Sequence, residues 1–276
     1  MLYYKRIAIA AAVVFAGLSL IGQEANYAEV ISKAKALSAA KKNPEAAAEA
    51  EKAYQMKDIT QNQKSTAAYL AGLYYFWGKK LADSDRILTQ TLKEDQHTKG
   101  MLYENNSVHF NILRNTKQYD RMNQALAVME KIHPQSKDFL NKKAAADKIN
   151  RYLEWEKMIK PVQELSAAKK YAESAAEAEK LYQKEGLTPQ QKATAAYFGG
   201  VSWARAGKPA EADRLFTLAL QEKNLSKSLK RDICTSHFYV LLRLGRKDQA
   251  EKTLEILRKN DLPADQLEKL REKLGK

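Results

Sequence analysis

The hexapeptide Leu37-Ser38-Ala39-Ala40-Lys41-Lys42 returns unchanged, 128 positions later, as Leu165-Ser166-Ala167-Ala168-Lys169-Lys170. At the same offset, about half of positions 37–94 are identical to their counterparts, without a gap. Self-similarity at a fixed spacing is the mark of a repeat architecture, in which each structural unit stacks on its neighbours. We therefore expect one block of structure to occur twice in this chain.

The composition of the chain favours helices. Its 276 residues include only six Pro and eleven Gly, and 45% of them are hydrophobic, which argues against disorder. Ala, Lys, Glu, Leu and Gln are abundant, and these residues are strong helix formers. No sustained alternation of Val, Ile and Thr indicates a strand. The predicted fold class is all-α.

A shorter pattern lies inside each half. It is clearest where small residues and aromatic residues alternate at helical spacing: Gly200, Trp203, Gly207, Ala212, Phe216 and Ala219. Small residues let two antiparallel helices approach closely, and aromatic side chains fill the space between them. Gly207 is placed to turn the chain from one helix into the next.

This pattern resembles the tetratricopeptide repeat. The resemblance implies a right-handed superhelical solenoid of antiparallel helix pairs, with a concave face made by the first helix of each pair. It also implies that ligands resembling extended peptides lie along that face. In the family's best-known peptide site, Lys and Asn clamp a carboxylate, but this chain has Tyr69 and Leu73 at those places. That clamp is therefore not expected here.

The register of the pairs follows from the small position of each second helix. Within each half this position recurs at one constant interval, from Ala46 to Ser84 to Met122 and again from Ser174 to Ala212 to Ala250. The step between the halves is 14 residues longer, enough for one extra helix near residues 136–149. The sequence thus predicts two blocks, 23–149 and 150–276, each with three helix pairs and an extra or capping helix. Pro161 is expected to end or kink a helix at the joint of one continuous superhelix.

The N-terminal segment, residues 1–22, differs from the rest of the chain. Lys5 and Arg6 precede an uncharged apolar run from Ile7 to Ile21, which is followed by Gly22. A basic start and about 15 apolar residues are typical of a secretory signal peptide, and a spanning helix needs about 20. We expect residues 1–22 to be a signal peptide of an exported, periplasmic protein. The alternative is a retained anchor in the inner membrane.

The chain carries a formal charge of +14 and a single cysteine, Cys234. The charge has two interpretations: solvated helix faces, or attraction to an acidic partner surface. Nucleic acid is not an expected partner of an exported protein, and membrane contact is expected only if the apolar segment is retained. Cys234 lies in an apolar helical run and is expected to be buried.

No catalytic, metal or cofactor motif occurs in the sequence. Phosphate-binding loops, nucleophile elbows and paired-cysteine motifs are missing, so we expect a protein that is not an enzyme and has no cofactor. His109 and His237 occupy equivalent places in the two halves and are expected to pack between helices. His97 and His133 have no Cys, Asp or Glu at the spacing that a metal site needs.

The resemblance places a set of aromatic, Arg and Asn side chains on the concave face, and such residues dominate the energetics of interfaces. The predicted binding residues are Tyr69, Leu73, Phe76, Trp77, Asn111, Arg114, Tyr197, Arg205, Tyr239 and Arg243. For Trp77 two interpretations stay open, because either a neighbouring helix pair or a ligand could cover its indole.

The predicted function is that of an exported scaffold, an adaptor or assembly factor that holds a protein or peptide partner in its concave groove. Two alternatives remain. One is a membrane-associated structural scaffold anchored by residues 1–22. The other is a protein that binds a glycan or small molecule through its Tyr- and Trp-rich face.

Overall fold

A computed structural model describes residues 26–94 and 97–275 of the chain. These residues form helices joined by short turns, with no strand among them, so the predicted all-α class is confirmed. In this part of the chain no helix combines the length and apolar character needed to cross a bilayer. The predicted signal peptide, residues 1–22, lies outside the described residues.

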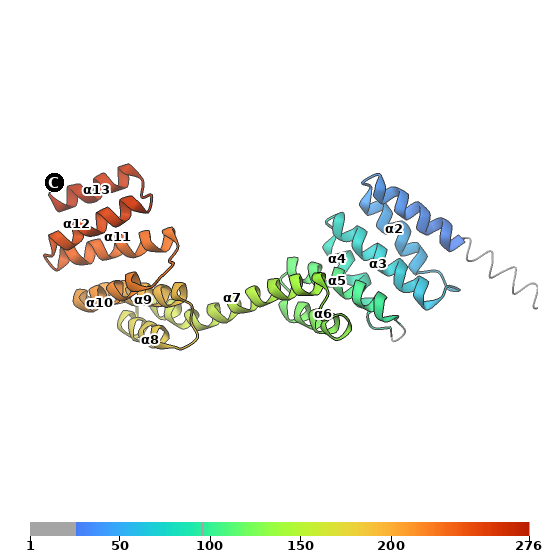
Figure 1. Ribbon diagram of the computed structural model, residues 1–276, viewed down its shortest axis with the longest axis horizontal. Helices are drawn as coiled ribbons and strands as arrows, with labels where there is room; N and C mark the ends of the chain where they lie inside the picture. The colour runs from blue at the N-terminus through green and yellow to red at the C-terminus, as the bar shows by residue number, and fades with distance from the viewer. Residues whose placement is uncertain (1–25, 95–96, 276) are drawn as a thin grey trace, which may run out of the picture. The chain divides into compact units, whose positions relative to one another are not determined.

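The chain divides into two compact units, residues 1–149 and 150–276, which we call unit 1 and unit 2 (Figure 1). In unit 1, a helical segment at 26–39 is followed by α2 (Asn43–Tyr54), α3 (Gln61–Trp77), α4 (Leu81–Thr91), α5 (Lys99–Asn115) and α6 (Tyr119–Ile132). Consecutive helices pack as antiparallel pairs, α3 with α4 and α5 with α6, and α3 also contacts α5. This is the tetratricopeptide-like arrangement expected from the sequence.

Unit 2 repeats the arrangement. Its helices are the second part of α7 (Lys137–Ala167), then α8 (Tyr171–Gln183), α9 (Pro189–Arg205), α10 (Pro209–Gln221), α11 (Lys227–Arg243), α12 (Lys247–Lys259) and α13 (Ala264–Leu274). Here α9 pairs with α10, α11 pairs with α12, and α13 covers α12. The first helices α3, α5, α9 and α11 all have 17 residues.

One expectation was partly wrong. Pro161 was predicted to end or kink its helix, and the helix does not end there: α7 runs through Pro161, and the extra helix expected near 136–149 is the first part of the same 31-residue helix. A proline inside a helix costs about 3 kcal/mol. Ile159 and Val162, on either side of exposed Pro161, are almost completely buried, and each contributes about 1.5–3 kcal/mol. Burial therefore offsets the cost of the proline.

The predicted register of the pairs is confirmed at the turns between the helices of each pair. At each turn one residue has a left-handed backbone, with φ between 59° and 78°: Lys41, Lys79, Lys117, Lys169, Gly207 and Gly245. Each donates its N–H to the carbonyl three residues earlier, and the next residue donates to the carbonyl five residues earlier. This is a Schellman motif, which satisfies carbonyls at the helix end.

The N-terminal ends of the first helices are also alike. The hydroxyls of Thr60 and Thr188 accept a hydrogen bond from the backbone N–H three residues on, and their own backbone N–H groups donate to the side-chain oxygens of Gln63 and Gln191, so that α3 and α9 each begin with a capping box. Thr98 and Ser226 cap α5 and α11 through their hydroxyls. Each first helix thus has a fixed start and a fixed end.

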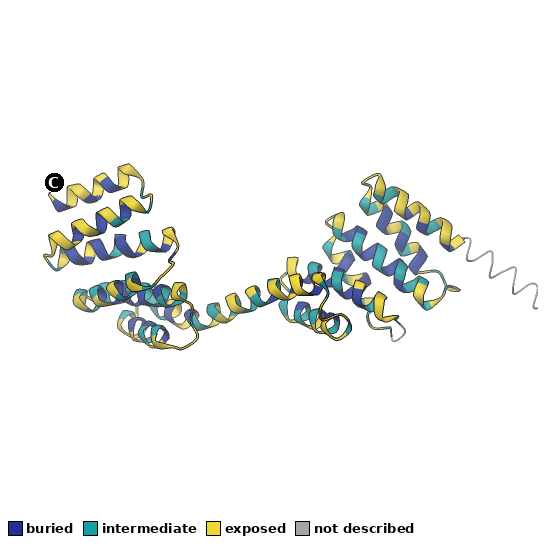
Figure 2. Cartoon of the chain, in the orientation of Figure 1, coloured by how far each residue is buried: buried dark blue, intermediate teal, exposed yellow. Residues whose placement is uncertain are grey.

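Close helix contacts depend on glycine, as the sequence predicted. A Cβ atom on Gly200 would lie 2.6 Å from the ring of Phe216, and one on Gly72 would lie 2.7 Å from Leu88. Phe216 and Leu88 are fully buried, so neither has room to move away. Figure 2 shows the buried residues between the packed helices of each unit and the exposed residues on their outer sides.

Candidate binding groove

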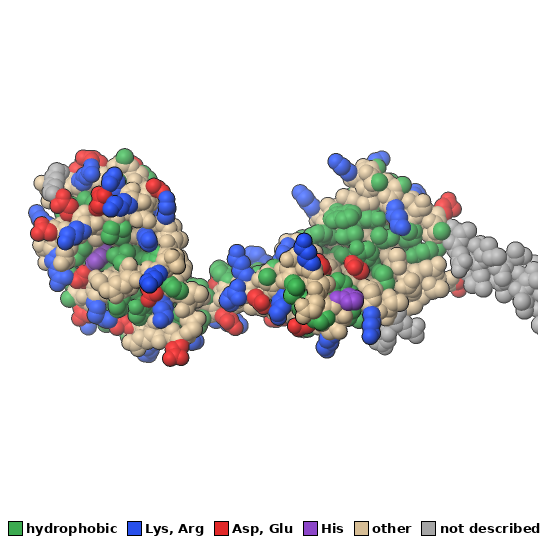
Figure 3. All heavy atoms as spheres, in the orientation of Figure 1, with side chains coloured by type: hydrophobic (Ala, Val, Ile, Leu, Met, Phe, Trp, Pro, Cys, Tyr) green, Lys and Arg blue, Asp and Glu red, His purple; other side chains and the backbone are tan. Residues whose placement is uncertain are grey.

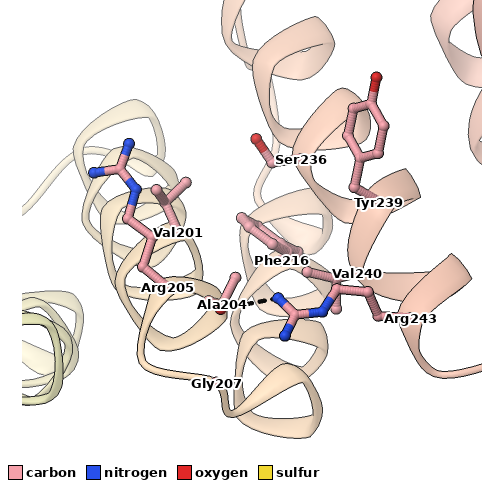
Figure 4. A pocket seen from close by; sticks show the side chains of 9 residues that line it. All are labelled: Val201, Ala204, Arg205, Gly207, Phe216, Ser236, Tyr239, Val240 and Arg243. Carbon is pink, nitrogen blue, oxygen red and sulfur yellow. Dashed lines mark hydrogen bonds between the residues drawn. The ribbon is translucent and has the colours of Figure 1, made fainter.

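Two adjoining pockets in unit 2 lie where α9 and α11 run side by side. The first, the turn-side pocket, has a volume of about 410 Å³ and lies next to the turns that follow these helices. Figure 4 shows its lining: Val201, Ala204, Arg205 and Gly207 on one side, Phe216 as the floor, and Ser236, Tyr239, Val240 and Arg243 on the other side. An open, partly apolar space with a few polar groups is typical of a binding site.

The second pocket, the loop-side pocket, has a volume of about 440 Å³ and lies toward the start of α11. Its lining comes from α9, α11, the loop that leads into α13, and α13 itself: Tyr197, Arg231, Asp232, Thr235, Ser236, Asp261, Leu262, Pro263 and Gln266. Ser236 lines both pockets. The two pockets therefore form one groove along α11, which we call the α9–α11 groove.

Small residues open the turn-side pocket. Gly200 brings α9 against the ring of Phe216, and Ala204 leaves the space above that ring unfilled. At the equivalent positions of the first half, Phe76 stands for Ala204 and Leu73 stands for Val201. These larger side chains pack against the core of unit 1, where both are partly buried.

Arg243 and Arg205 are the charged residues in the lining of the turn-side pocket, and Figure 4 shows the Arg205 guanidinium pointing away from Phe216. An Nη atom of Arg243 donates to the carbonyl oxygen of Ala204 at 3.1 Å, which ties α11 to the C-terminal turn of α9. The guanidinium of Arg205 lies 5.8 Å from the centre of the Tyr171 ring and has a long contact of 3.5 Å with the Ser166 hydroxyl. Both arginines are exposed.

Tyr239 is 43% exposed, although it is a large aromatic side chain. Its ring meets the ring of buried Phe238 edge-on at 5.6 Å, and the Lys273 ammonium stands 5.8 Å from its centre. Tyr197 is half-buried, with its ring 6.3 Å from the ring of Phe216. A rigid tyrosine that is held on one side and open on the other is suited to contact a ligand.

The loop-side pocket is of mixed charge. Arg231 donates to the backbone oxygens of Asn260 and Asp261, the latter at 3.3 Å, so its cation is partly used within the fold. A hydrogen bond from Lys227 lowers the pKa of the Asp261 carboxyl. Together with Asp232 and Asp261, Arg231 gives this pocket no dominant sign.

At the same place in unit 1, the protein's own side chains bond to one another. The Tyr103 hydroxyl lies 2.6 Å from the Ser136 hydroxyl, and the Ser107 hydroxyl donates to Asp138 at 2.9 Å. Lys142 also pairs with Asp138. The equivalent positions of the second half hold Arg231, Ala264, Thr235, Gln266 and Leu270, and there the loop-side pocket is open.

The structure brings four of the predicted binding residues together, since Arg205, Tyr239 and Arg243 line the turn-side pocket and Tyr197 lines the loop-side pocket. The other six lie in unit 1. Tyr69, Leu73, Phe76 and Trp77 follow one another along α3, and Asn111 and Arg114 lie on the neighbouring α5. Figure 3 shows hydrophobic side chains gathered on the visible face of this unit.

Trp77 is 51% exposed, so the neighbouring helix pair does not cover it. Its ring stands 5.7 Å from the ring of Tyr74, which is buried. Arg114 is exposed near the end of α5, and Asn111 is half-buried. These positions leave the ligand interpretation of Trp77 open.

Among the lining residues of the α9–α11 groove that sequence reasoning missed are four polar ones on helices: Arg231, Asp232, Ser236 and Gln266. The first three lie on α11 and the fourth on α13, between positions that were assigned by the tetratricopeptide pattern. One signal in the sequence could have found the groove. At two places in its wall, Ala204 and Gly207 replace the larger Phe76 and Lys79 of the first half.

The paired histidines are buried, as expected, and lie outside the lining of the groove. The Nε2–H of His109 donates to Asp85 at 2.7 Å, and His237 makes the same 2.7 Å bond to Asp213. Within the described residues, no three His, Cys, Asp or Glu side chains gather in a way that could hold a metal ion. Cys234 is buried, and burial raises the pKa of its thiol to about 11.

Comparison with known proteins adds no residue-level information. No protein-family model and no curated protein matches the sequence. Among solved structures, the TPR2AB domain of yeast Sti1 in its pHSP90 complex is 11% identical, with a TM-score of 0.46. The aligned region covers 91% of this chain and 99% of that chain. The TPR domain of P58(IPK) is 13% identical, with a TM-score of 0.38 and coverages of 91% and 65%.

A tetratricopeptide repeat protein from Parabacteroides merdae is 12% identical, with a TM-score of 0.38 and coverages of 91% and 85%.

Proposed function

We propose that this protein is a scaffold that holds an extended segment of a partner protein in the α9–α11 groove, as an adaptor or assembly factor. The observation that carries the proposal is the open wall of this groove. Tyr239 and two arginines line a space beside Ala204, and the larger Phe76, which packs against the core of unit 1, stands at the position equivalent to Ala204. Exposed aromatic and Arg side chains around an apolar floor are the common anchors of protein interfaces.

A site-specific photo-crosslinker tests this proposal. We would place p-benzoylphenylalanine at position 239, at position 197 and, as a control, at position 152. Tyr152 is 58% exposed on α7 and is not part of the groove lining. Positions 239 and 197 should give the same crosslinked partner in living cells, and position 152 should not. Equal crosslinking at all three positions would show that the partner touches the protein without binding in the groove, which would contradict the proposal.

The proposal includes export to the periplasm, in line with the apolar run at residues 7–21. Cell fractionation and N-terminal sequencing of the purified protein test it. A mature chain that starts near residue 23 supports a cleaved signal peptide. An intact N-terminus in the membrane fraction supports the anchored scaffold instead, and binding of residues 23–276 to anionic liposomes at low salt would add to that alternative.

A second candidate function concerns unit 1. The half-exposed indole of Trp77, backed by Tyr74, is suited to stack on the face of a sugar ring. A glycan that binds there should change the fluorescence of Trp77, and Trp77→Ala should weaken its binding by about tenfold or more. Undiminished glycan affinity in Trp77→Ala would remove this candidate.

A further inference from the structure

The arginines of the turn-side pocket differ from their neighbours in unit 2. Several other arginines there are paired with carboxylates on the protein, as Arg214 is with Glu179 at 2.6 Å and Arg258 is with Glu255 at 2.8 Å. Among the residues that the structure describes, no carboxylate stands within ion-pair distance of Arg205 or Arg243. The lining of the turn-side pocket also contains no Asp or Glu.

The electrostatic field at the turn-side pocket has two sources, the arginines and the ends of the helices. Both α9 and α11 end at this pocket, and each helix C-terminus carries about half a negative charge. The Arg243 guanidinium offsets these two partial charges, and the Arg205 guanidinium, which lies against Tyr171, adds about one net positive charge when it turns toward the pocket. Arg243 cancels part of the field of α9 directly through its bond to Ala204, and it keeps most of its donors free. With Arg205 turned toward it, the pocket is thus positive despite the two helix ends.

We propose that the turn-side pocket receives an acidic side chain, Asp or Glu, of the extended partner segment, with Arg205 and Arg243 as its partners. This inference rests on the function proposed above and adds the chemistry of the segment. A planar guanidinium matches a carboxylate with two parallel hydrogen bonds. The long contact of Arg205 to Ser166 is weak and leaves its guanidinium able to turn toward the pocket.

The length of the groove sets where the acid lies in the segment. From Asp232, in the loop-side pocket, to Arg243 the helix α11 rises by about 16 Å. An extended chain covers that distance with about five residues. The segment therefore carries its acid at one end, an apolar residue over Phe216 and Val240, and a polar residue at the mixed-charge loop-side pocket.

Phage display tests the proposal with the full chain. A library of random dodecapeptides would be selected against the wild-type protein, against Tyr239→Ala and against Arg205→Gln/Arg243→Gln. The control is Lys247→Gln/Lys252→Gln, which removes the same charge from exposed positions of α12 outside the groove. Peptides enriched by the wild type should carry Asp or Glu at one end of an apolar core, and the control should select the same peptides.

The affinity of an enriched peptide then gives the decisive number. Replacing its acidic residue by Gln or Asn should weaken binding by about tenfold, and Arg205→Gln/Arg243→Gln should show the same loss without any further effect of the peptide change. If a peptide needs Tyr239 for binding but keeps its affinity when its acidic residue is replaced by Gln, the acidic pocket is wrong. The proposed function is then still supported. If nothing selected depends on Tyr239, both the function and the pocket are wrong.

Discussion

Units 1 and 2 share one helical framework and fill it differently. Their helices start at equivalent positions of the two halves, as α3 and α9 do at Gln61 and Pro189. Their turns also fall at the same offset. Unit 1 has the larger Leu73 and Phe76 on α3 and hydrogen bonds from α5 to residues 136–138, whereas unit 2 has the α9–α11 groove at the equivalent positions. The framework thus fixes where a groove can form, and a few side chains decide whether it does.

The shared framework includes polar contacts whose donors differ. In unit 1, Glu51 accepts from the Tyr75 hydroxyl at 2.7 Å and pairs with Arg86. In unit 2, Glu179 accepts from the Trp203 indole at 2.6 Å and pairs with Arg214. The carboxylate keeps its place while the aromatic donor changes. Its position at the packed helices is therefore the constant feature.

The Asp–His contacts show the same principle with a change of position. Asp85 pairs with Arg121 and accepts from His109, and Asp213 accepts from His237. The cation beside Asp213 is Arg246, which lies at the place of Gln118 and not at that of Arg121. A cation can thus reach the same buried carboxylate from two places on the following helix.

The interiors of the two units differ most at one buried cluster. In unit 1 it contains Ser65, Thr91, His97 and Asn105, with Ser65 2.7 Å from His97. At the equivalent positions of unit 2, one apolar cluster contains Ala193, Ala219, Leu225 and Ile233. Asn105 is fully buried, and neither polar atom of its side chain has a partner among the described residues. The predictions below exchange features between the units.

The largest effect is expected from Ile233→Asn, which gives unit 2 the polar residue of unit 1. The change removes a fully buried apolar side chain and places an amide in an apolar cluster. Lost burial of about 2–3 kcal/mol and an unpaired polar group of about 1–3 kcal/mol together predict a loss of about 4 kcal/mol. Hydrogen exchange, read separately for each unit, measures it.

The control for this variant is Ile233→Val, which shortens the side chain without adding a polar group and should cost about 0.5–1.5 kcal/mol. Equal losses for Ile233→Asn and Ile233→Val would mean that the amide finds partners in unit 2. The apolar character of this cluster would then not be what separates the two interiors.

The reverse exchange, Asn105→Ile, should stabilise unit 1 by about 1–3 kcal/mol. A buried amide without partners costs free energy that an apolar side chain does not. Because Ile is larger than Asn, Asn105→Ala serves as a second variant that removes the amide without adding volume. A loss of stability in both variants would show that the amide is hydrogen-bonded in solution.

The helical framework could be predicted from the sequence because its signals are local. Small residues at a constant spacing and the two Thr–Gln capping boxes act within a few residues of the chain. The prediction that a helix could end at Pro161 was wrong because the free-energy cost of the proline is local, whereas the burial that offsets this cost is not. The burial of Ile159 and Val162 depends on helices far along the chain.

The groove could be predicted in part, and the reason is geometric. Tyr197, Arg205, Tyr239 and Arg243 follow from the register of the first helices. Whether their helices leave a space depends on side chains across the pair, such as Phe216 on α10, and on loops such as the one at Asp261. The bond from Arg243 to Ala204 likewise joins residues 39 positions apart, which no local pattern reveals.

A smaller effect is expected from acid. Burial lowers the pKa of His109 below its ordinary value of 6.5, although its bond to Asp85 opposes this. As the pH falls through about 6.5, His109 is therefore protonated in the unfolded chain before it is protonated in the folded chain. The stability from neutral His109 is present above about pH 6.5 and is lost as the pH falls below it. Unit 1 should be less stable to urea at pH 5.5 than at pH 7.5.

Asp85 acts at a lower pH. Burial by itself would raise the pKa of this carboxyl, but hydrogen bonds from Arg121, His109 and Gln118 hold it below its ordinary value of 3.8. Its contribution is thus present above pH 3.8 and is lost as the pH falls further. Between pH 7.5 and 5.5, His109→Gln should remove part of the pH dependence of unit 1. Parallel pH profiles for this variant and the wild type would assign the dependence to other groups.

The smallest effect is expected at the turns, where Lys79 and Gly207 occupy equivalent places. Both have a left-handed backbone, with φ of 60° and 78°. A left-handed backbone costs a residue with a Cβ atom about 1 kcal/mol more than it costs glycine. Glycine, however, gives the unfolded chain more conformational freedom, which lowers the stability of the folded state. Lys79→Gly should therefore stabilise unit 1 by only about 0.5–1 kcal/mol, measured as a shift of its urea midpoint.

The reverse change, Gly207→Lys, should destabilise unit 2 by a similar amount. A Cβ atom at Gly207 would meet no atom within 4 Å, so only backbone strain opposes the side chain. Gly207→Ala should cost the same as Gly207→Lys, because the strain depends on Cβ alone. If Lys is tolerated better than Ala at position 207, the lysine side chain itself stabilises the turn, and the four lysines at these turns would then have a structural role that glycine lacks.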